Sequence, residues 1–256
     1  MPRYAIKVEY DGSNYVGYQV QPNGPSVQAQ LDRALLKLAK RPADHPVLTV
    51  ASGRTDSGVH ALGQVVHFDL DFEIHPLALA KALNSILNKD IRVVAVSQVA
   101  LDFHARYHAI GKAYLYRIDT QAYPDPFKRF YTLHHPYRYD LGKMQRALTD
   151  LVGQHDFTSF CSTHSDKEDK VRTIKFATIE EDLVNQELRF MIAGNGFLYN
   201  MVRIIVGTLL QIGDGLKPVD EFKRLLAVKD RNQAGPTADP SGLYLYRVDY
   251  KEDIFK

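Results

Sequence analysis

A short loop between two predicted strands carries the residue types best suited to chemistry. It reads Ser52-Gly53-Arg54-Thr55-Asp56-Ser57-Gly58-Val59-His60-Ala61. Glycines let a backbone approach a ligand closely, the Asp56 carboxylate can serve as a nucleophile or a base, and the Arg54 guanidinium can hold a phosphate. Because Asp-Ser-Gly also forms ordinary Asx turns, this pattern alone leaves a purely structural interpretation open.

Aromatic and cationic residues alternate along a second predicted strand, Lys112-Ala113-Tyr114-Leu115-Tyr116-Arg117. This interleaving suits nucleic acid, since each base stacked on an aromatic ring is worth about 1–3 kcal/mol while cations contact phosphates. The alternative is that the tyrosines face a core. We expect that outcome for at least one of Tyr114 and Tyr116.

A third feature is an apolar helix, predicted over residues 197–212, whose narrow polar stripe is Asn200, Arg203, Gly207 and Gln211. A helix of this kind is buried, so Arg203 needs a partner for its desolvated charge. An arginine so placed is usually structural. If its partner is Asp56, the pKa of that carboxyl is lowered by about 1–3 pH units. Gly207 would let another segment approach the helix.

Hydrophobic periodicity predicts the elements that position these residues. In the first part of the chain we expect strands at 3–10, 47–52, 64–70 and 91–99, with helices at 26–40 and 76–87. In the second part we expect strands at 113–119, 171–180, 187–192 and 243–250, with helices at 140–151, 197–212 and 219–226. Both parts follow the order βαββαβ, which places helices on one face of an antiparallel sheet.

The expected fold class is therefore α+β, with two duplicated halves and a cleft between them. Residues 1–108 form the half that carries the Asp56 loop, and residues 109–256 form the half that carries Tyr114 and Arg203. One larger α+β domain is the alternative. Ligand sites commonly lie between domains, so the Asp56 loop and the Arg203 helix are expected to converge in the cleft.

Composition excludes several classes of protein. The 256 residues are 45% hydrophobic and 24% charged, which is typical of a globular chain. A single cysteine, Cys161, excludes a disulfide framework and a multi-Cys zinc site. Neither a signal-peptide core nor a run of about 18 apolar residues occurs, so we expect a soluble cytoplasmic protein without membrane contact.

The charge balance and the remaining motifs narrow the choice of ligand. The net charge is only +2, so a polyanion would have to bind a local patch. The run Lys167, Lys170, Arg172, Lys175 is either such a phosphate rail or a solvated face. Cys161 and His164 lack further ligands, and no Walker or G-x-G-x-x-G loop occurs. We expect no metal and no nucleotide cofactor.

Several ordered motifs resemble those of the bacterial-type tRNA pseudouridine synthases that act on the anticodon arm (pseudouridine synthase A). The similar blocks are residues 10–12, 17–19, 26–28, 53–61, 103–106, 112–117, 155–160, 196–203 and 242–245. They are spread over the whole chain. Two residues depart from the family pattern: Tyr18 stands where Trp is expected, and Asp239 where Pro is expected.

The resemblance implies an isomerase that converts uridine to pseudouridine at tRNA positions 38, 39 and 40. It implies that Asp56 is the essential aspartate, that Tyr114 stacks on the target base, and that Arg203 pairs with the aspartate. It also implies RRM-like, ferredoxin-like halves and a homodimer with a positively charged cleft for tRNA. Arg54, Arg106 and Lys112 are our candidates for phosphate contacts.

The residues fit this chemistry, since an isomerisation needs no redox cofactor and no energy source. Asp56 would act on a flipped-out uridine, either by attacking C1′ or by taking a proton from the sugar. A non-catalytic RNA-binding protein would need an RNP1-type strand, which residues 112–119 lack. A carboxylate glycosidase would need two acids about 5–10 Å apart, and only Asp56 stands out.

Overall fold

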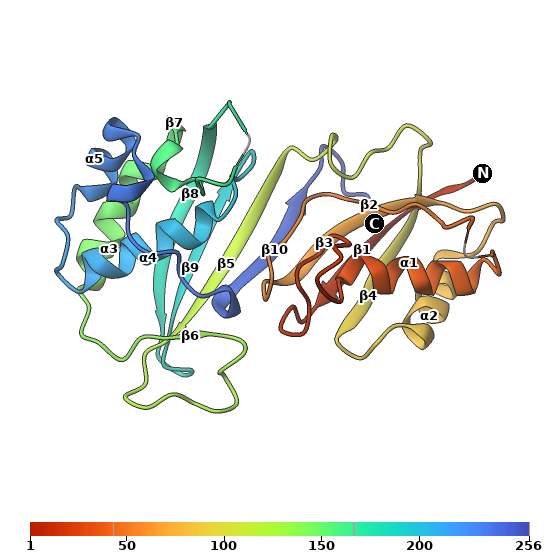
Figure 1. The fold of residues 1–256 in the computed structure, drawn as a ribbon, viewed down its shortest axis with the longest axis horizontal. Coiled ribbons are helices and arrows are strands. Elements are labelled where there is room, and N and C mark those ends of the chain that lie inside the picture. The colour runs from red at the N-terminus through yellow and green to blue at the C-terminus, as the bar shows by residue number, and fades with distance from the viewer. Residues whose placement is uncertain (43, 166, 256) are drawn as a thin grey trace. The chain divides into compact units, whose positions relative to one another are not determined.

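The computed structural model describes residues 1–42, 44–165 and 167–255. The chain forms two compact units: unit 1 is Met1–Ile110 with Tyr244–Lys256, and unit 2 is Gly111–Leu243 (Figure 1). Both units combine helices and strands, which confirms the α+β class. We expected residues 109–256 to form the second half, whereas the C-terminal segment Tyr244–Lys256 belongs to unit 1.

Unit 1 contains a mostly antiparallel sheet and two helices (Figure 1). Its elements are β1 (Arg3–Tyr10), α1 (Val27–Leu38), β2 (Val50–Ala51), β3 (His60–Asp69), α2 (Pro76–Ile86), β4 (Ile91–Val99) and β10 (Leu243–Asp249). The strand order is β4-β1-β3. The far edge of β3 has two partners: β2 pairs antiparallel near Val66, and β10 pairs in parallel at His60.

Local sequence explains most of these elements. Side chains along β1 are buried at Tyr4, Ile6, Val8 and Tyr10, as the alternation predicts. The Ser26 hydroxyl caps α1 by accepting a hydrogen bond from the Ala29 N–H at 3.2 Å. The strand expected at 47–52 shrinks to two residues. Pro46 has no N–H to donate, and the hydroxyl of Thr49 bonds to Asp32 of α1 at 2.6 Å.

Unit 2 contains a second sheet, with helix α3 packed against both α4 and β8. Its elements are β5 (Gly111–Asp119), β6 (Leu133–His134), α3 (Leu141–Leu148), β7 (Gly153–Asp156), β8 (Val171–Asp182), β9 (Glu187–Gly194), α4 (Met201–Gly213) and α5 (Glu221–Val228). Short 3₁₀ helices cover Thr149–Leu151, Thr158–Phe160, Arg231–Gln233 and Pro240–Gly242.

The strands of unit 2 run antiparallel in the order β5-β9-β8-β7, and β6 adds a short parallel pairing to β5. The strand expected to close a second βαββαβ unit is β10, which pairs in parallel with β3. The expectation that both halves repeat one plan stays a prediction.

Helix α4 starts four residues later than expected, at Met201. Asn200 takes a left-handed conformation with φ +61°, which separates residues 197–199 from the helix. Nearly all of α4 is buried, as its apolar circumference predicts. A Cβ atom built on Gly207 would lie 1.9 Å from the Pro236 carbonyl oxygen, so only glycine allows this approach.

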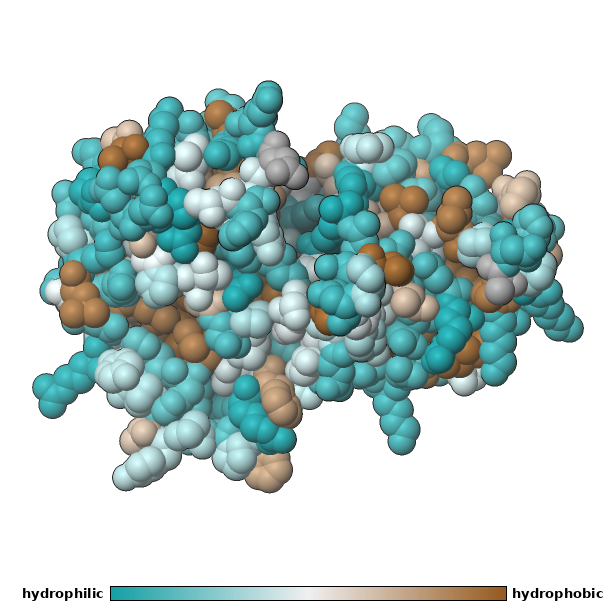
Figure 2. Space-filling view, in the orientation of Figure 1, coloured by the Kyte–Doolittle hydropathy of each residue, from teal (hydrophilic) through white to brown (hydrophobic). Residues whose placement is uncertain are grey.

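The face of the molecule drawn in Figure 2 is largely hydrophilic. Figure 2 shows hydrophobic residues only in small groups on the visible face of each unit. Among the residues that the structure describes, none of the helices is long and apolar enough to cross a bilayer.

Candidate active site

The Asp56 loop joins β2 to β3 in unit 1, and the loop that follows β1 holds its backbone. The Thr55 carbonyl accepts a hydrogen bond from the Tyr18 N–H at 3.1 Å. The Gly58 N–H donates to the Tyr15 carbonyl at 3.3 Å, and the Asp56 carbonyl accepts from the Val59 N–H at 3.1 Å. Asp56 is half-buried at the turn. Its backbone is therefore fixed by partners from two segments.

The buried side chains of Gln64 and Tyr10 form hydrogen bonds that hold this loop. The Gln64 amide donates to the Gly53 carbonyl at 2.8 Å, and its oxygen accepts from the Ser52 hydroxyl at 2.7 Å. The hydroxyls of Tyr10 and Thr55 are hydrogen-bonded at 2.8 Å. Burial raises the pKa of Tyr10 to about 12, so this hydroxyl stays neutral at physiological pH. Both are positioning residues; Tyr10 lies in one of the family-like blocks, whereas Gln64 lies in none of them.

Tyr114 lies in β5, where it pairs with Ile192 of β9. Its half-buried ring meets the ring of Phe197 edge-on, with centroids 5.0 Å apart. Two residues along, Tyr116 is fully buried, and its hydroxyl donates to the Asp239 carbonyl at 2.6 Å. The expectation that at least one of the two tyrosines faces the core is confirmed for Tyr116. Lys112 is half-buried on the same strand.

Hydrogen bonds within unit 2 orient the Arg203 guanidinium on α4. Its Nε donates to the Ala238 carbonyl at 2.7 Å, and its Nη1 donates to the Asn200 side-chain oxygen at 3.0 Å. The Ala238 N–H returns a hydrogen bond to the Arg203 carbonyl at 3.1 Å. Residues 238 and 239 therefore tie the Arg203 helix to Tyr116 on the tyrosine strand. This link fixes the direction of the guanidinium within unit 2.

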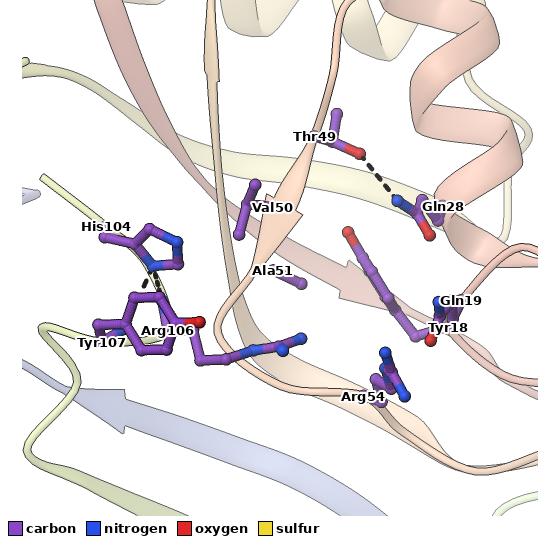
Figure 3. Close-up of a pocket in the computed structure, with 10 residues that line it drawn as sticks. All are labelled: Tyr18, Gln19, Gln28, Thr49, Val50, Ala51, Arg54, His104, Arg106 and Tyr107. Atoms are coloured by element: carbon purple, nitrogen blue, oxygen red, sulfur yellow. Dashed lines mark hydrogen bonds between the residues drawn. The ribbon is translucent and has the colours of Figure 1, made fainter.

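Arg54 and Arg106 both line one open depression on unit 1, of about 210 Å³ (Figure 3). Strand β2, the Asp56 loop, helix α1 and the turn at residues 104–107 supply its walls. Arg54 and Arg106 are thus two expected site residues that line the same depression. Asp56 belongs to unit 1, while Lys112, Tyr114 and Arg203 belong to unit 2. The pairing of Asp56 with Arg203 stays a prediction.

Comparison with known proteins decides the family. The sequence pattern described as tRNA pseudouridine synthase matches residues 6–108 and 147–251. The chain belongs to the tRNA pseudouridine synthase family.

Curated relatives agree over almost the full length. The tRNA pseudouridine synthase A of Lacticaseibacillus casei is 52% identical and covers 98% of this chain and 100% of its own. The proteins of the same name from Leuconostoc citreum and Latilactobacillus sakei are 48% and 50% identical, over 99% and 97% of this chain and 99% of their own. The family consists of isomerases that convert uridine to pseudouridine in tRNA, and this chain is one of them.

The two departures from the family pattern have different local consequences. The Asp239 carboxylate caps a 3₁₀ helix by accepting from the Ser241 N–H at 2.9 Å, so it is well accommodated. Tyr18 is only 3% exposed. Its hydroxyl is buried without a hydrogen bond to any residue in the described ranges, beside a Thr49 hydroxyl already bonded to Asp32.

We expect Tyr18→Phe to raise the free energy of unfolding by about 1 kcal/mol, because it removes a buried hydroxyl that lacks a partner. Urea unfolding measures this, with Tyr123→Phe, 84% exposed, as the matched control. A loss of stability of similar size would show instead that the hydroxyl has a bound water as partner.

The run of cations at residues 167–175 of this synthase lies on the surface of unit 2. Lys167 and Lys175 are exposed. The Arg172 guanidinium donates to the carbonyls of Asp169 and Val171, which directs it along its own backbone. The phosphate rail stays a prediction.

Stability of the enzyme should depend on pH through His67 of β3. Burial, together with the nearby Arg3 and His104, lowers the pKa of His67 to about 4, against about 6.5 in an unfolded chain. As the pH falls from about 6.5 to 4, His67 binds a proton in the unfolded chain but stays neutral in the folded chain. The free energy of unfolding should therefore decrease over this window, by on the order of 3 kcal/mol.

Urea unfolding across that pH window measures the effect of His67. The variant His67→Gln should show a shallower pH dependence than the wild-type enzyme. His45→Gln, at a site where the imidazole is 75% exposed, is the control and should match the wild type. Equal slopes for all three proteins would exclude His67 as the titrating group.

Proposed function

We propose that this enzyme modifies uridines 38, 39 and 40 in the anticodon stem-loop of tRNA, with Asp56 as the reacting carboxylate. The observation that carries this proposal is the Asp56 loop itself. It matches the catalytic motif of the family, and hydrogen bonds from Tyr18, Gly58 and Gln64 hold it rigid. Such preorganisation is what a reacting group needs, since a fixed geometry lowers the entropic part of the barrier.

The reaction breaks the C1′–N1 bond, turns the uracil and joins C1′ to C5, with the C5 proton removed and a proton supplied to N1. No atom is gained or lost. The Asp56 carboxylate acts either by attacking C1′ or by taking a proton from the sugar. In either case the carboxylate must be ionised, and we propose that the positive charge of Arg203 keeps it ionised. If the substrate carries a labelled hydrogen at C2′ and the label is lost to solvent during the reaction, proton abstraction is favoured.

The target uridine must leave the base stack before it can react, at a cost of a few kcal/mol. The proposal assigns the stacking surface to the half-buried ring of Tyr114. Phosphate contacts are assigned to Arg54, Arg106 and Lys112. These contacts predict that affinity for tRNA falls steeply with rising salt.

The proposal also includes a homodimer that works in the cytoplasm, and an active-site cleft between two RRM-like halves. The support for these points is the relationship to the family. Light scattering on the purified enzyme tests the homodimer.

Incubation with an unmodified tRNA transcript, followed by site-resolved detection of pseudouridine, tests the proposed function. Product at positions 38, 39 and 40 is the expected result. Product at other uridines would overturn the site assignment, and binding without product would favour a non-catalytic RNA-binding protein.

The ring of Tyr114 should matter more than its hydroxyl. Tyr114→Phe keeps the stacking surface and should keep most of the affinity for tRNA. Tyr114→Ala removes a stacking contact worth about 1–3 kcal/mol, so affinity should fall about 5- to 150-fold. Filter binding and pseudouridine mapping on both variants measure this. Equal loss of activity in the two would show that the hydroxyl is the group that matters.

A further inference from the structure

The depression on unit 1 has features that the reaction at Asp56 does not require. At about 210 Å³ it is smaller than the roughly 300–1,000 Å³ of pockets that enclose a whole small ligand. It is also open to solvent. These dimensions suit one unit of a longer chain better than an enclosed metabolite.

Two exposed cations lie at this depression. Arg54 and Arg106 are both exposed, and neither guanidinium makes a hydrogen bond or an ion pair with the parts of the chain that are described. Figure 3 shows Arg106 extending across the depression toward the side where Arg54 lies. An anionic group placed between them would be held from two sides.

An aromatic platform stands next to these cations. The rings of His104 and Tyr107 are stacked, with centroids 4.1 Å apart and planes 28° apart. Tyr107 is 77% exposed, so the platform is open to solvent. Bases of single-stranded RNA stack on such rings.

The turn that carries the platform is rigid, because imidazole nitrogens accept its backbone N–H groups. His104 Nδ1 accepts from both the Arg106 and the Tyr107 N–H at 3.2 Å. Buried His67 accepts from the Ala105 N–H at 3.1 Å, and the Ala105 carbonyl accepts from the Tyr250 hydroxyl at 2.7 Å. An exposed ring on such a turn loses little conformational entropy when a base stacks on it.

We propose that this depression is a second nucleotide-binding subsite, in which one unpaired RNA nucleotide stacks its base on Tyr107 and places its phosphate between Arg54 and Arg106. This inference rests on the proposed function for its ligand, since the RNA is the tRNA substrate. It shares Arg54 and Arg106 with the phosphate contacts assigned there, and it adds Tyr107 as the stacking surface for a second base. Gln19, at the rim, offers an amide to the edge of the base.

Titration of the full-length enzyme with unmodified tRNA transcript, by filter binding at several salt concentrations, tests the subsite. Tyr107→Ala should weaken binding about 5- to 150-fold, and Tyr107→Phe should bind within about twofold of the wild type. Arg106→Gln should lower the slope of log affinity against log salt by about 0.7–0.9. The control is Tyr123→Ala, an exposed tyrosine of unit 2 that should bind like the wild type.

The outcomes separate this inference from the proposed function. If Tyr107→Ala binds tRNA as the wild type does while pseudouridine still forms, the subsite is overturned, and the assignment of Asp56 and of positions 38, 39 and 40 stands. If the wild type forms no pseudouridine, the proposed function fails, whereas a Tyr107-dependent affinity still supports the subsite. Thermal melting of each variant excludes unfolding as the cause of weaker binding.

Discussion

Asp56→Asn should abolish pseudouridine formation, lowering the rate by at least about 10⁴-fold, while affinity for tRNA changes only a few-fold. The substitution keeps the shape of the side chain and removes its charge and its nucleophilicity. Because Tyr15 and Tyr18 form hydrogen bonds with the backbone of this loop, its conformation does not depend on the carboxylate. The loss should therefore be one of chemistry and not of folding.

Single-turnover pseudouridine mapping and filter binding measure the two effects of Asp56→Asn separately. Asp56→Ala should behave in the same way. Asp44→Asn, whose carboxylate is 78% exposed and lies outside the loop, is the control and should be as active as the wild type. Product at the wild-type rate from Asp56→Ala would eliminate Asp56 as the reacting group. Parallel loss of binding and product in a folded variant would assign it to tRNA binding instead.

Gly207→Ala should destabilise the enzyme by about 3 kcal/mol or more, lowering the melting temperature by on the order of 10 °C. The added Cβ would lie 1.9 Å from the Pro236 carbonyl oxygen. This neighbour is backbone, so the helix and the 236–238 segment must separate. The gain of about 1 kcal/mol in helix propensity from Gly to Ala does not offset that strain.

The displacement at Gly207 should also reach the proposed site. Ala238 holds the Nε of Arg203, so a shifted segment would leave this guanidinium without one of its partners. Calorimetry and pseudouridine mapping measure both effects. Gly142→Ala in α3 is the matched control, because its Cβ would come no closer than 3.4 Å to its neighbours. A melting temperature for Gly207→Ala equal to the wild type would show that the helix moves away without cost.

Local sequence predicted the parts of this protein that depend on neighbours within one element. The alternation of β1, the Ser26 cap of α1 and the all-round apolarity of α4 each follow from residues a few positions apart. The motifs around Asp56, Tyr114 and Arg203 indicate the family by residue type and order alone. Residue type and spacing suffice there, because the chemistry itself selects them.

The hydrogen bonds that hold the candidate site residues in position were not predictable in the same way. Gln64 lies on a strand whose pattern indicates only that it is buried, and the bond from its amide to Gly53 spans 11 residues. The partners of Arg203 include Ala238, 35 residues away. Periodicity tells which face of an element is buried, but it does not identify the atom that the face meets.

By itself, then, the sequence determined the fold class and the family and supplied the candidate side chains of the proposed site, because composition, periodicity and motif order are properties of the chain. Only the tertiary structure decided that β10 pairs with β3, through Tyr244 and His60. It also decided that α4 begins after a left-handed Asn200, and that His67 braces the turn before Tyr107. These features depend on hydrogen bonds and packing between distant segments. The pattern of a strand or helix does not specify which distant segment will be its partner.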